Sequence, residues 1–136
     1  GRVKEIFKTS KGEYVAPAPI ENSLNAHPLI EMSMVSGLGQ PAAYAMVVLG
    51  EDIPRKQNDP AFRKEVEQEL STLLKQINAD LADYEQLRML VIAPEPWSIE
   101  NGCLTPTMKI KRNRIESAVE PKVEIWYTTK GVVQWA

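Results

Sequence analysis

The feature that most constrains this chain is a long amphipathic pattern that begins after Asp59. Aspartate is a favoured N-cap residue, and Pro60 stands at the first helical position, where its missing N–H leaves no hydrogen bond unmade. One apolar stripe then recurs at helical spacing to about Leu81, which predicts a helix over 60–81. The stripe consists of Phe62, Val66, Leu70, Leu73, Leu74, Ile77 and Leu81. A helix with one apolar face buries that face against a second layer, which the rest of the chain has to supply.

Three segments with strand-like patterns can form that layer. Residues 30–35 alternate between outward and inward positions, residues 43–49 are continuously apolar, and residues 87–93 are a third apolar run. Alternation suits a strand with one solvated face, whereas a continuous run suits a strand buried on both faces. The sequence therefore predicts a small three-stranded sheet.

Shorter elements flank this sheet. Residues 3–15 predict a β-hairpin with its turn at Lys11-Gly12, and a short helix follows from Pro17 until Pro28 ends it. The segment 114–127 predicts a last helix, with a kink or break at Pro121. We therefore expect an α+β domain, in which an N-terminal β-hairpin precedes a small three-stranded sheet covered by helices.

Composition excludes several classes of function. The chain has 136 residues, 43% of them hydrophobic, which suits one globular domain, and its net charge of -2 argues against nucleic-acid binding. One cysteine, Cys103, cannot form an intramolecular disulfide, and His27, the only histidine, cannot build a multi-histidine metal site, so we expect no metal site. No apolar run approaches the ~20 residues that cross a bilayer, and we expect no signal peptide. We expect a cytoplasmic protein and, from the abrupt start, a piece of a longer one.

Two polar segments carry the candidate chemistry. The first is GRVKEIFK at 1–8 with GEYVAPAPIEN at 12–22, and the second is NGCLTPTMKIKR at 101–112. By themselves they suit a surface hairpin with solvated charges and a polar loop that leads into a basic helix start. A basic patch for phosphate or RNA is a further alternative, formed by Lys109, Lys111, Arg112 and Arg114. It lacks the interleaved aromatic residues that stack on bases.

Together, in this order, the two segments resemble the two C-terminal motifs of adenylate-forming enzymes, the superfamily of acyl-CoA synthetases, nonribosomal adenylation domains and luciferases. Within it they look most like long-chain fatty acyl-CoA ligases. The resemblance implies that residues 1–136 are the mobile C-terminal lid domain, and that a larger N-terminal domain, absent from this chain, binds ATP and acid. Such enzymes make a fatty acyl-AMP and then transfer the acyl group to coenzyme A, with Mg²⁺ expected in the full-length enzyme.

The resemblance assigns the central role to Lys109, which matches the lysine that reaches into the active site during adenylation. There the carboxylate of the acid attacks the α-phosphate, so two anionic groups must approach each other. A compact ammonium on a flexible stem can contact both. Many members of the superfamily have Ser-Gly before this lysine, where this chain has Thr107-Met108. Lys111 therefore stays open as the alternative.

Other roles follow from the first motif. Lys4 matches the hinge position, at which a few backbone torsions absorb the rotation of the domain. Arg2 matches an arginine that hydrogen-bonds the nucleotide ribose. The turn formed by Ser10, Lys11 and Gly12 matches the loop that approaches the pantetheine tunnel, where a glycine lets the backbone come close to a ligand.

The implied partners are the N-terminal domain, a fatty acid, ATP and coenzyme A. We expect this domain to be inactive alone, because it carries no glycine-rich phosphate loop and no acyl tunnel. Peripheral membrane association is open through the absent domain. The alternative function is a non-catalytic interaction module that keeps the lid fold.

Overall fold

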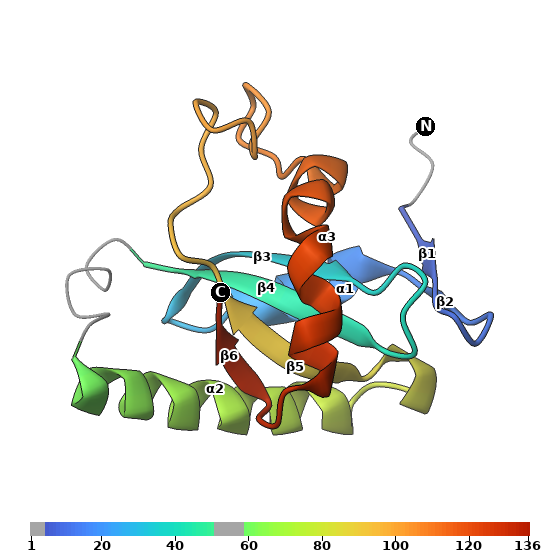
Figure 1. Cartoon of the computed structure of the whole chain (residues 1–136), viewed down its shortest axis with the longest axis horizontal. Coiled ribbons are helices and arrows are strands. Elements are labelled where there is room, and N and C mark those ends of the chain that lie inside the picture. The colour runs from blue at the N-terminus through green and yellow to red at the C-terminus, as the bar shows by residue number, and fades with distance from the viewer. Residues whose placement is uncertain (1–4, 51–58) are drawn as a thin grey trace.

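A mixed four-stranded sheet forms the middle layer of the computed structural model, which describes residues 5–50 and 59–136 (Figure 1). In order across the sheet, the strands are β3 (Ile30–Ser36), β4 (Ala43–Leu49), β5 (Leu87–Ile92) and β6 (Val133–Trp135). β3 pairs antiparallel with β4, whereas the β4–β5 and β5–β6 pairs are parallel. Parallel neighbours need crossover connections, which here carry two of the helices.

One face of the sheet is covered by α1 (Pro17–Asn25) and α2 (Pro60–Ala79). The Asp59 carboxylate accepts a hydrogen bond from the Ala61 N–H at 3.0 Å, so the predicted N-cap is confirmed. The stripe of α2 packs on alternate residues of β4 and β5. Its most deeply buried members are Val66, Leu70 and Leu74.

The opposite face is covered by α3 (Arg112–Thr128) and the long connection 93–111. Trp126 of α3 packs edge-on against Tyr44 of β4, with ring centroids 6.0 Å apart. Met46 and Met89 fill the space between sheet and helix, as flexible thioether side chains do in irregular gaps. β4 is therefore buried on both faces, which explains its continuously apolar sequence.

The N-terminal hairpin consists of β1 (Phe7–Lys8) and β2 (Tyr14–Val15). Phe7 and Val15 point into the core between the hairpin and α1. At Gly37, a Cβ atom would lie 3.0 Å from the Phe7 ring and 2.9 Å from the Ala43 Cα. Only glycine lets the end of β3 approach the hairpin this closely.

The expected fold class is confirmed, with two differences in detail. The sheet has a fourth strand, β6, which the sequence did not predict. The last helix runs through Pro121 without a break, although proline supplies no N–H to the helix ladder. Ile115 before the proline and Val123 after it are buried in the same core, and this packing holds the helix together.

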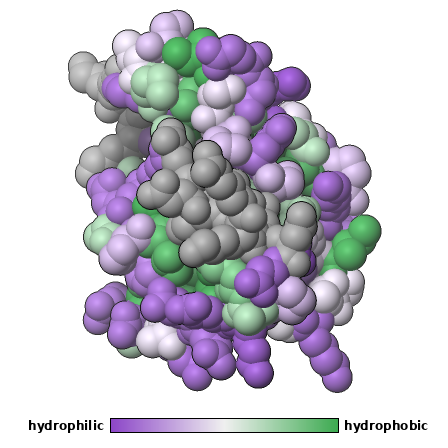
Figure 2. All heavy atoms as spheres, turned by 90° about the vertical axis from the view of Figure 1, so that its left-hand side faces the viewer, coloured by the Kyte–Doolittle hydropathy of each residue, from purple (hydrophilic) through white to green (hydrophobic). Residues whose placement is uncertain are grey.

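The outer surface matches the amphipathic pattern. In Figure 2, hydrophilic side chains stand outward along the lower edge of the face, where α2 lies in Figure 1. The exposed residues of α2 include Lys64, Glu65, Gln68, Glu69 and Lys75. Among residues 5–50 and 59–136, no helix combines the length and the apolar character needed to span a bilayer.

Candidate functional site

The second motif folds into a tight hairpin, here called the Lys109 hairpin (residues 104–110). Its arms meet at a bridge between Leu104 and Ile110. The Thr105 N–H donates to the Lys109 carbonyl at 2.7 Å, and the Met108 N–H donates to the Thr105 carbonyl at 2.8 Å. Met108 has φ 65°, the left-handed conformation that closes the turn. Backbone hydrogen bonds therefore fix the position of Lys109.

Lys109 is exposed on this fixed backbone. Leu104, on the facing arm, is 1% exposed, and Ile110 packs against the core beneath α3. Because side chains alternate along an extended arm, Lys109 and Lys111 both point away from the side that Ile110 occupies. In the described part of the chain, neither ammonium has an ion-pair partner. The arrangement presents two cations and does not by itself choose between them.

Asn101 fastens the root of the hairpin. Its Oδ1 accepts hydrogen bonds from the N–H groups of Ser98 (3.0 Å) and Cys103 (3.1 Å), and its Nδ2 donates to the Pro96 carbonyl at 3.0 Å. Gly102, with φ 81°, lets the chain turn beside it. The Asn-Gly pair at the start of the motif therefore has a structural role.

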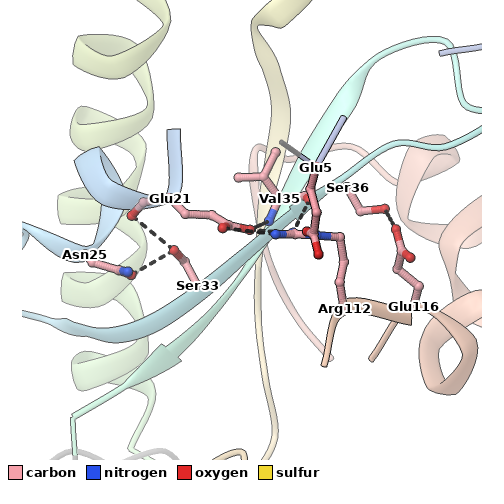
Figure 3. A network of polar contacts seen from close by, with 8 residues as sticks. All are labelled: Glu5, Glu21, Asn25, Ser33, Val35, Ser36, Arg112 and Glu116. Carbon is pink, nitrogen blue, oxygen red and sulfur yellow. Dashed lines mark hydrogen bonds and ion pairs between the residues drawn. The ribbon is translucent and has the colours of Figure 1, made fainter. Parts of the chain in front are cut away.

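Arg112, the last residue of the motif, is a functional candidate that the sequence indicated only as a member of the basic patch. Its Nη1 donates to Glu21 Oε2 at 2.5 Å and to the Val35 carbonyl at 2.9 Å, and Nη2 donates to Glu21 Oε1 at 3.2 Å (Figure 3). Its Nε donates to Glu5 Oε2 at 2.6 Å. We call these four residues, Arg112, Glu5, Glu21 and Val35, the Arg112 network. It joins the N-terminal segment, α1, β3 and the start of α3.

The inner half of the Arg112 network is buried and fully paired. The side chains of Arg112 and Glu21 are 12% and 11% exposed. Glu21 Oε2, which accepts from Arg112 Nη1, also accepts a hydrogen bond from the Val35 N–H at 2.7 Å. Burial opposes the charge on Arg112, but the hydrogen bonds and charges of Glu21 and Glu5 outweigh it and raise the pKa of the guanidinium.

These contacts correct one alternative drawn from the sequence. A surface patch for phosphate or RNA required Arg112 to stand outward with Lys109, Lys111 and Arg114. The guanidinium instead turns inward to two carboxylates and a carbonyl. Of these four cations, Lys109, Lys111 and Arg114 are exposed.

A second polar cluster lies beside the Arg112 network (Figure 3). The Ser36 hydroxyl donates a short hydrogen bond to Glu116 of α3, and Tyr44 lines the same pocket, of about 360 Å³. Burial raises the pKa of Tyr44 to about 12, while its hydrogen bond with Ser36 lowers it and the Glu116 charge raises it. The phenol is therefore neutral at physiological pH.

The turn of the first motif is exposed and tightly closed. The Thr9 N–H donates to the Glu13 carbonyl at 2.9 Å, and the Gly12 N–H donates to the Thr9 carbonyl at 3.0 Å. Gly12 has φ 84°, which an L side chain rarely adopts. Ser10 is tied to the connection between β3 and β4, since its N–H donates to the Gln40 carbonyl at 2.9 Å.

The predicted site residues fall into separate places. The turn with Ser10, Lys11 and Gly12 lies at the β1–β2 tip, apart from the Lys109 hairpin, which lies in the long connection between β5 and α3 (Figure 1). Arg2 and Lys4 lie outside the described residues. What connects the two motifs are the contacts of Arg112 with Glu5 and Glu21.

The described residues offer little to a metal ion. Across 5–50 and 59–136, no group of three or more histidine, cysteine, aspartate and glutamate side chains could hold one. These residues therefore provide no set of ligands for the Mg²⁺ expected with ATP. For an anionic ligand, the site presents the exposed side chains of Lys109 and Lys111.

Known proteins match the chain along most of its length. The family model described as the AMP-binding enzyme C-terminal domain matches residues 4–131. The chain is 32% identical to the long-chain-fatty-acid–CoA ligase FadD15 of Mycobacterium tuberculosis, over 93% of this chain and 23% of that protein. It is 34% identical to the peroxisomal long chain acyl-CoA synthetase 7 of Arabidopsis thaliana, over 82% of this chain and 18% of that protein.

A solved structure shares the fold. The A-PCP didomain of carboxylic acid reductase from Segniliparus rugosus, in complex with AMP, superposes with a TM-score of 0.73 at 28% identity, over 91% of this chain and 17% of that one. The chain thus spans about a fifth of the length of the curated relatives that it matches. The resemblance seen in the two motifs is confirmed, and the chain belongs to the C-terminal domain family of AMP-binding enzymes.

Proposed function

We propose that this chain is the mobile lid of an ATP-dependent long-chain fatty acid–CoA ligase. The observation that carries the proposal is the exposed Lys109 on a hairpin held by backbone hydrogen bonds, in a chain similar to such ligases. A cation held outward on a rigid support suits a reaction centre completed by another domain. The relatives matched are ligases, so a non-catalytic module is not favoured.

Lys109 acts in the first half-reaction. A carboxylate oxygen of the fatty acid attacks the α-phosphorus of ATP, the bond to the bridging oxygen breaks, and pyrophosphate leaves. The Lys109 ammonium lies between the two anions and offsets their repulsion. At 4 Å and an effective dielectric of 20, one such ion pair contributes about 4 kcal/mol. Mg²⁺ would be bound with ATP, outside the described residues.

The remaining roles belong to the first motif. In the second half-reaction the thiol of coenzyme A attacks the acyl carbonyl and AMP leaves. Lys4 is the hinge about which the lid rotates between the two steps, and Arg2 binds the ribose. The exposed turn of Ser10, Lys11 and Gly12 then approaches the pantetheine. The domain alone is inactive, and the ligase works in the cytoplasm.

The test separates the two half-reactions in the full-length ligase. Lys109→Ala is expected to slow acyl-AMP formation, measured as pyrophosphate release, by ~10²–10³-fold, the scale for deleting one preorganised electrostatic contact. Transfer from supplied acyl-AMP to coenzyme A is expected to stay nearly unchanged, because the lid has then carried the lysine away.

Lys111→Ala is the matched control, since it removes a cation from the same side of the same arm. It is expected to be mild. A large adenylation defect in Lys111→Ala with none in Lys109→Ala would move the catalytic role to Lys111. Normal adenylation in both variants would remove the hairpin from the active site.

A further inference from the structure

The two halves of the Arg112 network differ in burial. The Glu21 side chain is 11% exposed, and its carboxylate accepts three hydrogen bonds, two from Arg112 and one from the Val35 N–H. Glu5 is 64% exposed, and its contact to Arg112 Nε is the one interaction of its side chain given by the described residues. The inner half therefore maintains the fold, whereas the outer contact is not needed to compensate a buried charge.

The outer contact joins two places that the proposed mechanism must coordinate. Glu5 directly follows Lys4 in the sequence, and Arg112 follows Lys109 by three positions. The Arg112 guanidinium is planar, and both of its terminal nitrogens donate to Glu21. It therefore cannot rotate independently when Glu5 moves. A shift of the segment behind Lys4 is therefore transmitted to the root of the Lys109 hairpin.

That root is itself rigid. The Lys111 N–H donates to the Cys103 carbonyl at 2.8 Å, and the Ile115 N–H donates to the Lys111 carbonyl at 3.1 Å. Only Ile110 and Lys111 lie between Lys109 and Arg112, and Ile110 is packed against the core. No flexible segment separates the guanidinium from the catalytic lysine.

We propose that Glu5 and Arg112 form a positioning pair that sets the Lys109 hairpin relative to the hinge segment when the lid closes for adenylation. This rests on the proposed function, because it concerns the placement of Lys109. Neither residue touches substrate; both act through Lys109. Small displacements of a catalytic group are costly in rate, so even an exposed ion pair can matter in this position.

The test uses Glu5→Gln in the full-length ligase. The amide keeps the size of the side chain and removes its charge. Acyl-AMP formation is expected to slow about two- to fivefold, the factor that corresponds to one exposed ion pair. Transfer from supplied acyl-AMP to coenzyme A and the melting temperature are expected to stay unchanged. Glu13→Gln is the matched control, an exposed carboxylate in the same hairpin, and is expected to leave both half-reactions at the wild-type rate.

A second background makes the test specific. If Glu5 acts by placing Lys109, Glu5→Gln has no further effect on adenylation in a Lys109→Ala enzyme. A merely structural role would lower the rate by the same factor in both backgrounds. Equal factors would overturn the inference, and so would a normal adenylation rate in Glu5→Gln.

These failures are distinct from failure of the proposed function. A strong adenylation defect in Lys109→Ala, together with a normal rate in Glu5→Gln, overturns the positioning pair alone. A normal rate in Lys109→Ala overturns the inference, and a normal rate in Lys111→Ala as well overturns the proposed role of the hairpin with it.

Discussion

Lys109 and Arg112 are cations three positions apart in one motif, and the fold places them in opposite environments. Lys109 is exposed and is fixed only through its backbone, whereas Arg112 is 12% exposed and donates to two carboxylates and a carbonyl. A buried cation needs partners within its own chain, because desolvation is costly. An exposed cation on a rigid support is available to a group from outside. Within one motif, therefore, burial separates the residue that holds the fold from the residue that we propose meets the ligand.

The largest effect that tests this difference is on stability. Arg112→Met leaves the Glu21 carboxylate buried with only the Val35 N–H as partner. The free energy of unfolding is expected to fall by about 3–5 kcal/mol, the usual loss when a buried pair loses one member. Urea denaturation of the 136-residue chain measures it. Both faces of its sheet are covered by buried core, so the chain is expected to unfold cooperatively.

Two further variants sharpen the result. Lys109→Ala is expected to change the free energy of unfolding by less than about 0.5 kcal/mol, as exposed substitutions do. Adding Glu21→Gln to Arg112→Met is expected to recover part of the loss, because the amide can still accept from Val35 without burying a charge. Equal losses in Arg112→Met and Lys109→Ala would contradict the comparison.

A smaller effect concerns the neutral polar group beside the Arg112 network. The pKa of Tyr44 is raised to about 12 by burial, with the Glu116 charge adding to the rise. A phenol with a raised folded-state pKa stabilises the fold fully below its unfolded pKa of about 10, and this contribution is lost as pH rises through the folded value. Wild-type chain is therefore expected to lose on the order of 1 kcal/mol more between pH 8 and 11 than Tyr44→Phe does.

Urea denaturation at the two pH values measures that difference. Tyr14→Phe is the matched control, because Tyr14 is 58% exposed. It is expected to follow the wild-type pH dependence. If Tyr44→Phe lost stability as steeply as wild type, Tyr44 would not be the group that titrates between folded and unfolded states.

The regular elements could be predicted because each carries its own periodic signal. The predicted helix over 60–81 corresponds to α2 (Pro60–Ala79), and the predicted strand over 43–49 is β4. β6 has three residues, too few for a pattern, and it is formed by pairing with β5. The crossovers through α2 and α3 advance in the same direction across the sheet on opposite faces, so they have opposite hands. Since right-handed crossovers prevail strongly, a pair of opposite hands could not be expected from the sequence.

The candidate site divides in the same way. Lys109 was found because its motif resembles a known one, and its exposure suits the role. Arg112 lies in the same motif, but its partners Glu5 and Glu21 stand 107 and 91 positions away. No local pattern pairs charges over such distances. The one indication in the sequence was that the first motif contains acidic residues and the second contains basic ones. Neither motif, taken alone, shows which of these residues form pairs.

The smallest predicted effect concerns the turn that carries Lys109. Met108 is 56% exposed with φ 65°, a conformation that costs a non-glycine residue about 1–2 kcal/mol. Met108→Gly removes this strain but gives the unfolded chain more freedom, which costs about 0.5–1 kcal/mol. Stability is therefore expected to rise by about 0–1.5 kcal/mol, while acyl-AMP formation slows slightly because the looser turn holds Lys109 less firmly. Urea denaturation and pyrophosphate release measure the two effects.

Gly39 supplies the matched control, because it has φ 72° and nothing lies within 4 Å of an added Cβ. Gly39→Ala introduces the same left-handed strain in an open turn without a collision, and it is expected to lose about 1 kcal/mol or somewhat more, with no change in adenylation. Together the two variants separate the cost of the backbone conformation from the contacts of the side chain. If Met108→Gly instead lost several kcal/mol, the Met108 side chain would be holding the hairpin. Lys109 would then depend on side-chain packing, as Arg112 does, and the contrast between the two cations would not stand.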